Sequence, residues 1–548
     1  MKHPAKKCLA LLLSLVMAFT LFAVAFAAEN VPAEEKTPII LIPGFGQTET
    51  DVFDENGNNI GHINDFQLPG LNVESIIKKV LAPAIVSVLT RSDVLLSKKI
   101  TEVMADIFRP FALNDDGTPV YRREIPHYDA PFSELPPEDQ VVVQHHIAIH
   151  DLDDYNDVRY YFTYDSFGSV KTAADDLHNY VHNVVLAQTG ASKVTLVPIS
   201  QGATVLTQYL ASYPEDYPYI KKIVSMIPAF DGSQIVGDVM TDNVNIYDLD
   251  RVHEEILPAL LPGNTGYQVS IALRLVLSGR VTEKVLHAAL EAARKLLIVN
   301  STMMWALCPA EQYAVAKEQY LKDGKHDKVL AECEAYDAAR KALPDTLKQL
   351  MADGVFVHIV ACYDEEFLVH YLFGSDGMNS DGLLTPQSSG LGATAAPLGQ
   401  TLGDDYVSPH TYCDDPTHNH ISPDNVIDAS TGALPENTWY FKGILHTEAN
   451  FHDDIKNFAA KLILDDSITD IYTYPGQGQF IDAAAAVDHS YVGSVVTYYY
   501  DAAGNLLYYT YNPTDTKPDA FWVGLHSAVN GVYRLLKKLD VLKLNLFA

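Results

Sequence analysis

The sequence predicts an α/β fold in which a mostly parallel central sheet is flanked by helices. Two observations support this. A short apolar run occurs at residues 38–42 (PIILI), and a second, mainly apolar segment occurs at 193–198 (KVTLVP). Such segments are typical of strands buried on both faces of a parallel sheet. Between residues 158 and 227, strand patterns alternate with helical patterns, which is the order that crossover helices between parallel strands require.

The elements of this core follow in order along the chain. We expect strands at 158–164, 193–198 and 220–227, with helices at 170–186 and 203–211. Within 170–186 the apolar residues recur at helical spacing, and Gly190 provides a stop signal just beyond. The strand pattern resumes at 355–363 and 438–441, and a helix is expected at 453–464.

The alternation breaks between residues 231 and 353, where the pattern is largely helical, as in an insertion that caps a sheet domain. After residue 465 a hairpin is expected at 495–500 and 506–511, followed by an apolar helical tail at 521–547. The predicted organisation is a signal peptide at 1–27, a first core part at 37–230 with an insertion at about 48–150, a helical cap at 231–353, a second core part at 354–465 and a C-terminal appendage at 466–548.

Composition and the N-terminus restrict the partners and the compartment. The 548 residues are too many for one compact core, and the formal net charge of -32 argues against a nucleic-acid partner. Lys2, Lys6 and Lys7 precede an apolar run at 9–26, and Ala25-Phe26-Ala27 fits a signal-peptidase site. We therefore expect an exported, extracellular protein. Because the run is nearly long enough to span a bilayer, an uncleaved anchor is the alternative.

A candidate nucleophile lies between a predicted buried strand and a predicted helix, in residues 197–203 (VPISQGA). A serine at such a sharp turn, here Ser200, is held exposed at the carboxyl edge of the sheet. Gly202 provides the small residue that a close approach of strand and helix requires. The pattern G-x-S-x-G has glycine two positions before the serine, whereas this chain has Pro198.

Acyl transfer at a serine also needs donors for the developing oxyanion. The Gly-rich turn Pro43-Gly44-Phe45-Gly46 follows the first apolar run, where the second donor of such sites originates. We predict an oxyanion hole formed by the backbone amides of Phe45 and Gln201. The alternative is a Gly-rich turn without a catalytic role.

The base and its acid must follow the serine in the order Ser, Asp, His. Asp381, in residues 379–388 (NSDGLLTPQS) after the strand at 355–363, is the favoured acid, with Asp376 and Asp364 as alternatives. The favoured base is His446, between the last predicted strand and the last core helix, with His452 as the alternative.

Several segments together resemble the lipase and lecithin:cholesterol acyltransferase-like branch of the α/β-hydrolases. They are IPGFG near the start, YFTYD before an amphipathic helix, TGASKVTLVPISQGA around Ser200, FDGS after the next strand, SDGLLTPQSS around Asp381 and the LH at His446. The resemblance spans roughly residues 38–465. It implies an α/β-hydrolase fold, a covalent acyl-enzyme and an ester or lipid acyl substrate, with acyl transfer to another alcohol as a variant of hydrolysis.

The predicted activity is hydrolysis of carboxylic esters without a cofactor or metal, with a small-molecule ester or lipid, or a lipid surface, as partner. A peptidase or thioesterase on the same scaffold, and a non-catalytic surface or binding protein, are the competing hypotheses. His410, Cys413, Asp414, Asp415, His418 and His420 could supply zinc ligands, but their spacing fits no standard structural site. We expect a polar loop there.

Overall fold

The computed structural model divides the chain into two compact units, 1–37 and 38–548, and its description falls almost entirely within the second. The predicted signal peptide and the alternative acid Asp376 lie outside the described residues. These are residues 36–63, 94–146, 150–244, 250, 252–256, 258, 264–276, 287–367, 374, 377–413, 415, 417–449, 452–482, 494–500, 506–513 and 519–538.

A seven-stranded sheet forms the centre of the protein, and every pair of neighbouring strands in it is parallel. The predicted α/β fold class is confirmed, because parallel neighbours need crossover connections and the helices supply them. In spatial order the strands are β5 (Arg159–Tyr161), β1 (Ile39–Ile42), β6 (Val194–Pro198), β7 (Ile220–Met226), β8 (Phe356–Tyr363), β11 (Thr438–Lys442) and β12 (Phe480–Asp482).

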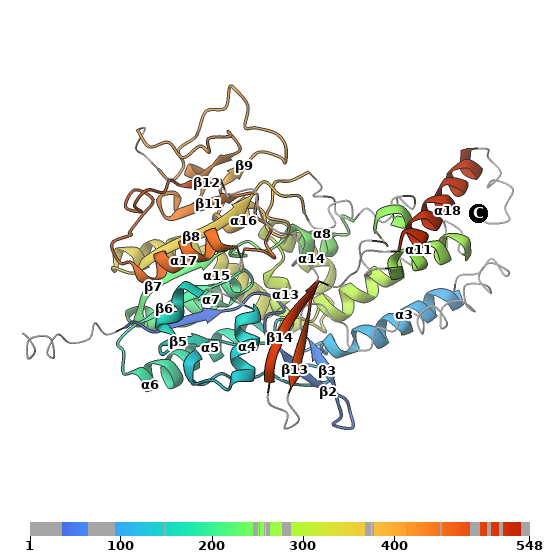
Figure 1. Cartoon of the computed structure of the whole chain (residues 1–548), viewed down its shortest axis with the longest axis horizontal. Helices are drawn as coiled ribbons and strands as arrows, with labels where there is room; N and C mark the ends of the chain where they lie inside the picture. The colour runs from blue at the N-terminus through green and yellow to red at the C-terminus, as the bar shows by residue number, and fades with distance from the viewer. Residues whose placement is uncertain are drawn as a thin grey trace, which may run out of the picture. The chain divides into compact units, whose positions relative to one another are not determined.

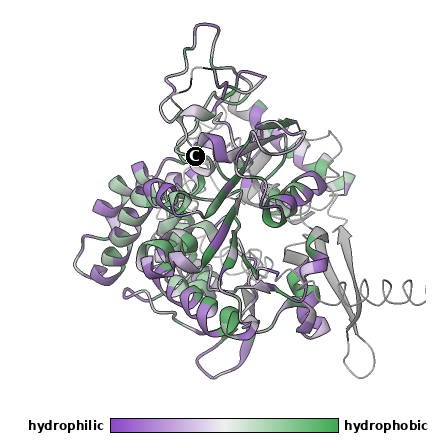
Figure 2. Cartoon of the chain, turned by 90° about the vertical axis from the view of Figure 1, so that its left-hand side faces the viewer, coloured by the Kyte–Doolittle hydropathy of each residue, from purple (hydrophilic) through white to green (hydrophobic). Residues whose placement is uncertain are grey.

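Helices cover both faces of this sheet, and side chains alternate between the two layers. Ile40 and Ile42 belong to one apolar cluster with α5 (Val170–Asn179), α7 (Gly202–Ser212) and α15 (Asp327–Ala352). Ile39 and Leu41 belong to another cluster with α17 (Asp453–Leu464). Because both faces are covered, all of β1 is buried. Figure 1 shows the strands between these helices, and Figure 2 shows the apolar colour concentrated in the central strands.

The predicted core helices form close to their expected bounds. Ser169 caps α5 by accepting from the Thr172 amide, and the helix continues through a π-helical turn at Tyr180–Leu186 into α6 (Ala187–Thr189). Gly190 ends it with φ +69°, the left-handed conformation that a residue without Cβ adopts at little cost.

The segment between β7 and β8 is largely helical where it is described, with short turns between its helices. Its apolar cluster includes Met240, Trp305 and Tyr313, and Phe45 and Leu383 from the core pack against it. The same cluster includes Phe111 and Phe167 from outside the segment, so the segment shares its core with neighbouring parts of the chain. Its elements are α8 (Gln234–Thr241), a π turn at Val252–Ile256, α11 (Asn264–Val276), a π turn at Arg294–Ile298, α13 (Thr302–Ala306), α14 (Ala310–Tyr320) and α15.

Two parts of the sheet structure have no counterpart among the predicted elements. The insertion after β1 contains α3 (Val94–Phe108) and α4 (Pro137–His146) and also a small antiparallel sheet, ordered β3-β2-β4. Its strands, β2 (Thr50–Phe53), β3 (Asn59–Ile63) and β4 (Arg122–Glu124), are too short for a clear alternating pattern. In addition, β12 pairs with β11, so the central sheet extends beyond residue 465, where we expected the core to end.

The C-terminal hairpin lies at the predicted place, with β13 (Ser494–Tyr500) antiparallel to β14 (Leu506–Pro513). The tail forms α18 (Ala520–Lys538), which packs on α11 (Figure 1). Within the described ranges, no helix is long and apolar enough to cross a membrane. Shorter elements are β9 (Thr394–Ala395), β10 (Ile427–Asp428), α16 (Pro386–Ser389) and 3-10 turns at Arg109–Phe111, Phe132–Glu134, His150–Tyr155, Pro214–Tyr219, Ala429–Thr431 and Pro435–Asn437.

Candidate active site

Ser200 lies at the turn between β6 and α7 in a strained backbone conformation. Its φ is +50°, a region that residues with a Cβ rarely occupy and that costs about 1–3 kcal/mol. The turn is held at the carboxyl end of β7, where the Ser200 amide donates to the Met226 carbonyl at 3.0 Å and the Ser200 carbonyl accepts from Ala229 at 3.0 Å. The neighbouring strand therefore fixes the strained turn, and the serine side chain remains partly exposed.

The close approach of the start of α7 to the end of β1 explains why residue 202 is glycine. A Cβ at this position would lie 2.3 Å from the Ile42 carbonyl oxygen and 2.8 Å from that of Pro43, both of them backbone atoms. No side chain fits there without a shift of β1 or α7. The glycine that the sequence pattern singles out is thus required by the packing of the turn.

The turn at Pro43-Gly44-Phe45-Gly46 lies beside the serine. A Cβ at Gly44 would be 3.0 Å from the Ser200 Cβ and 3.4 Å from its Oγ. The Gly44 amide donates to Gln47 Oε1 at 2.6 Å, and the Gly46 amide donates to Ser166 Oγ at 3.2 Å. With these amides engaged by side chains of the protein, the loop has a defined shape next to Ser200.

Buried tyrosine and glutamine side chains support the same loop. Tyr164 donates its hydroxyl to the Pro43 carbonyl at 2.7 Å, and Tyr161 donates to the Gln47 carbonyl at 2.7 Å. The buried side chain of Gln201 donates to the Ser166 carbonyl at 3.2 Å. Burial raises the pKa of the Tyr164 hydroxyl well above its ordinary value, so this group stays a neutral donor.

The Gln201 amide stands at the N-terminus of α7. Within the described part of the chain it donates to no acceptor, whereas the next three amides donate to the carbonyls of Ile199, Ser200 and Gln201. An amide in this position, at the positive end of a helix, is suited to a negatively charged oxygen.

Asp381 is fully buried in the loop after β8, and both of its carboxylate oxygens have hydrogen-bond partners. Its Oδ1 accepts from the Leu383 amide at 3.0 Å and from the Leu384 amide at 2.7 Å. Its Oδ2 lies 2.7 Å from His446 Nδ1, and its backbone carbonyl accepts from the His446 amide at 2.6 Å. The loop thereby holds the carboxylate and the histidine as one unit.

His446 connects this carboxylate to the serine. Its Nε2 lies 2.8 Å from Ser200 Oγ, and the residue is 7% exposed. The three side chains come from loops after β6, β8 and β11, because the carboxyl ends of parallel strands meet at one edge of the sheet. The structure therefore brings Ser200, Asp381 and His446 into a continuous hydrogen-bonded line.

The described alternatives are engaged elsewhere. The Asp364 carboxylate lies 3.5 Å from Lys442 Nζ, in an ion pair at the ends of β8 and β11. His452 is the N-cap of α17, where its Nδ1 accepts from the Asp454 amide at 3.3 Å. Neither of these contacts involves Ser200 or His446.

An apolar surface adjoins the line of polar side chains. Phe45 stacks edge-on against Phe167 with ring centroids 5.0 Å apart, and Phe167 packs in the same way on Phe111. Leu383 and Leu384, next to Asp381, pack in the same apolar cluster of the helical segment. The site therefore lies between a polar sheet edge and this apolar cluster.

Two groups of side chains in the described ranges have the composition of metal ligands, and neither includes a residue of this site. One is His178, His182 and Asp216, and the other is Cys413, His418, His420 and Glu436. In the first group, Asp216 already accepts from both histidines, at 2.7 Å and 2.8 Å.

No family model and no curated protein matches the chain. Among solved structures it is similar to a chain in the crystal structure of the Tle4–Tli4 complex, with 12% identity, a TM-score of 0.30, and coverage of 78% of this chain and 97% of that chain. This likeness is too distant to support an argument, so the α/β fold is assigned from the topology of the sheet itself.

Proposed function

We propose that this protein is an exported serine hydrolase that cleaves carboxylic esters through an acyl-enzyme on Ser200. The observation that carries the proposal is the unbroken line from Asp381 Oδ2 through His446 to Ser200 Oγ, with contacts of 2.7 Å and 2.8 Å. A serine hydroxyl becomes a nucleophile only when an adjacent base takes its proton, and the base needs a third group to orient it.

The geometry supports the following cycle. His446 Nε2 accepts the Ser200 proton as Oγ attacks the ester carbonyl carbon, and Asp381 stabilises the imidazolium that forms. The amides of Gln201 and Phe45 donate to the oxyanion of the tetrahedral intermediate. Collapse of the intermediate expels the alcohol, which takes the proton from His446. Water, or another alcohol in acyl transfer, then attacks the acyl-enzyme with His446 again as base.

The apolar surroundings support an acyl chain as the part of the substrate that is recognised. Phe45 and Leu383 are partly buried, pack on the apolar cluster of the cap, and come from the two loops that adjoin the serine and the aspartate. Burial of methylene groups against such side chains stabilises a complex by about 0.8 kcal/mol for each group. A small-molecule or lipid acyl ester suits this surface, as does transient contact with a lipid surface.

Labelling with a fluorophosphonate tests the nucleophile. We expect Ser200 to be labelled in the native protein, and Ser200→Ala to lose both labelling and hydrolysis of p-nitrophenyl esters. Ser467→Ala is the matched control, since Ser467 is exposed in a surface turn, where it donates to Asp465. An unlabelled Ser200 in folded protein would favour the non-catalytic binding hypothesis.

A set of substrates with one acyl group tests the reaction class. We expect the ester to be cleaved much faster than the matching anilide, which models a peptide bond. Faster cleavage of the thioester or the anilide would replace the esterase assignment by a thioesterase or a peptidase. Esters of increasing chain length then measure how much of the apolar surface contributes to kcat/KM.

Export rests on the N-terminal pattern alone. We expect the mature protein recovered outside the cell to begin at Ala28, after the Ala25-Phe26-Ala27 pattern. N-terminal sequencing of that protein is the test. Recovery of the intact chain from the membrane fraction would favour the uncleaved anchor.

A further inference from the structure

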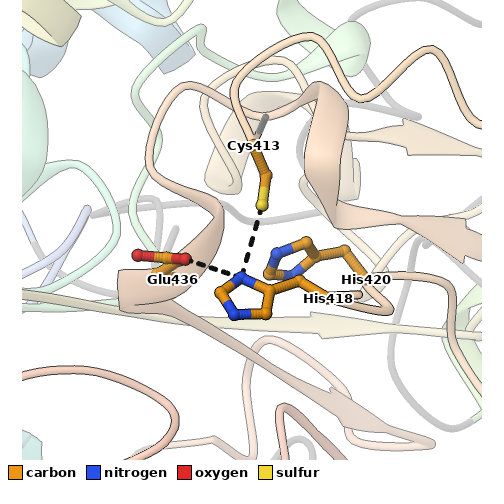
Figure 3. A group of neighbouring side chains, drawn as sticks. All are labelled: Cys413, His418, His420 and Glu436. Atoms are coloured by element: carbon orange, nitrogen blue, oxygen red, sulfur yellow. Dashed lines mark hydrogen bonds and ion pairs between the residues drawn. The ribbon is translucent and has the colours of Figure 1, made fainter. Parts of the chain in front are cut away.

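Cys413, His418, His420 and Glu436 form a cluster of potential metal ligands outside the candidate active site. One ligand atom of each lies within 4.8 Å of a ligand atom of every other. Figure 3 shows the thiol, the two imidazoles and the carboxylate pointing toward one another. Three of these residues come from the loop between β9 and β10, and Glu436 comes from the turn before β11. Glu436 is the member that the sequence spacing did not indicate.

The hydrogen bonds of Gln479 determine which ring nitrogen of neutral His420 carries the proton. The Gln479 side-chain amide nitrogen donates to the carbonyls of Pro435 at 2.6 Å and Thr438 at 3.0 Å. Its Oε1 is therefore the atom that faces His420 Nδ1, at 2.8 Å, and must accept the Nδ1 proton. In neutral His420 the lone pair is then on Nε2.

This lone pair has no hydrogen-bond partner among the described residues, although His420 is only 1% exposed. A buried nitrogen acceptor left unsatisfied costs about 1–3 kcal/mol. An unpartnered Nε2 at this position therefore indicates a bound ligand. Metal-binding histidines have this arrangement, in which one nitrogen donates to a protein oxygen and the other binds the ion.

The spacing of the remaining ligands matches zinc. The Cys413 Sγ lies 3.6 Å from His418 Nδ1. With Zn–S of about 2.3 Å and Zn–N of about 2.05 Å, a tetrahedral site has an S–N edge of about 3.6 Å. Glu436 Oε1 lies 3.0 Å from the same nitrogen, a little shorter than the O–N edge of about 3.3 Å that the same geometry requires. On the other side of the His418 ring, Nε2 lies 3.6 Å from Asp415 Oδ2.

We propose that Cys413, His418, His420 and Glu436 bind one Zn²⁺ ion in a structural site. A thiolate and two imidazoles exclude the hard ions Mg²⁺ and Ca²⁺, which prefer oxygen ligands. Four protein ligands complete a tetrahedron and leave no open position for a substrate, as in structural zinc sites. Cys413 and His420 are buried, while His418 and Glu436 are partly exposed, which provides a route for the ion.

The site would fasten the long loop between β9 and β10 to the central sheet. Through Gln479, His420 is already connected to the start of β11 at Thr438 and to the segment before β12. His446 follows the other end of β11, so the zinc site and the candidate active site lie at opposite ends of that strand. The ion therefore acts on stability and not on the chemistry at Ser200.

Zinc stoichiometry of the full chain tests the proposal. The purified protein is treated with EDTA, incubated with ZnCl₂, desalted and analysed for metal. We expect one zinc per chain, with a Tm a few degrees above that of the EDTA-treated protein. Cys413→Ser and His420→Gln should each lose the zinc. His410→Asn is the matched control, because His410 lies in the same loop but outside the cluster, and it should keep the zinc.

Wild-type protein without zinc, or equal zinc in Cys413→Ser and wild type, would overturn the proposal. Where a variant does not fold, the absorption spectrum of Co²⁺ bound to the wild-type chain tests whether Cys413 is a ligand. Tetrahedral cobalt with a thiolate ligand has a charge-transfer absorption in the near ultraviolet, whereas cobalt at His178, His182 and Asp216 has no sulfur ligand and lacks it. Cobalt binding without this band refutes Cys413 as a ligand.

Discussion

Replacement of Asp381 by asparagine gives a quantitative test of the candidate active site. The carboxylate Oδ1 accepts from the amides of Leu383 and Leu384, at 3.0 Å and 2.7 Å. In Asp381→Asn the amide oxygen must occupy this position, because an NH₂ group there would face two donors. The NH₂ group then faces His446 Nδ1, which has to become the acceptor, so the ring proton moves to Nε2.

A histidine protonated on Nε2 cannot accept the Ser200 proton. The side chains would stay in place, and the loss would come from the wrong tautomer. We expect kcat for a p-nitrophenyl ester to fall by about 10³–10⁴-fold, equivalent to about 4–5.5 kcal/mol in the activation free energy. The Tm should change little, since the shape of the side chain is preserved.

Asp364→Asn is the matched control, because Asp364 pairs with Lys442 and makes no contact with His446. Its kcat should stay within about threefold of wild type, a difference of less than 1 kcal/mol. A loss of less than tenfold in folded Asp381→Asn protein, or a larger loss in Asp364→Asn, would refute the assignment of the acid. Asp376→Asn extends the comparison to the other candidate that the sequence left open.

Three further predictions concern the surrounding structure. Gly202→Ala should lower the free energy of unfolding by about 3 kcal/mol, because its Cβ would lie 2.3 Å from the Ile42 carbonyl oxygen; an unchanged urea midpoint would contradict this. His452→Ala should lose the N-cap of α17 and about 1 kcal/mol of stability while keeping kcat, and loss of kcat would make His452 a competitor of His446. Burial, and to a smaller extent the nearby charge of Lys222, lowers the pKa of His358 to about 3. Below pH 6.5 the unfolded chain therefore binds a proton at this residue, whereas the folded chain does not. Stability should therefore fall as the pH falls from 6.5 to 4, by about 3 kcal/mol from this residue, and His358→Leu should lack that part of the decline in urea titrations at each pH.

The fold class and the turn at Ser200 were predictable from local sequence. A strand buried on both faces is mainly apolar, so IILI and VTLVP are recognisable without knowledge of their partners. Gly202 was recognisable because the tight crossing of strand and helix leaves no room for a side chain. Pro198, which departs from the expected glycine, ends β6 in register with Ile42 of β1.

Other elements had too little local signal. The strands β2, β4 and β12 have four, three and three residues, so their alternation is too short to recognise. For β4 and β12, the partner strand that makes them strands is distant in the chain. For β12, that partner is β11, about forty residues earlier, a pairing no local pattern encodes.

By itself, the sequence determined the parallel sheet, the helical insertion and the order of serine, aspartate and histidine along the chain. Only the tertiary structure decided which aspartate meets which histidine, and that Glu436 joins Cys413, His418 and His420. The physical reason is the same in both cases. Hydrophobic periodicity is a local property of the chain, whereas a hydrogen-bonded line or a ligand cluster depends on loops that the sheet brings together across many intervening residues.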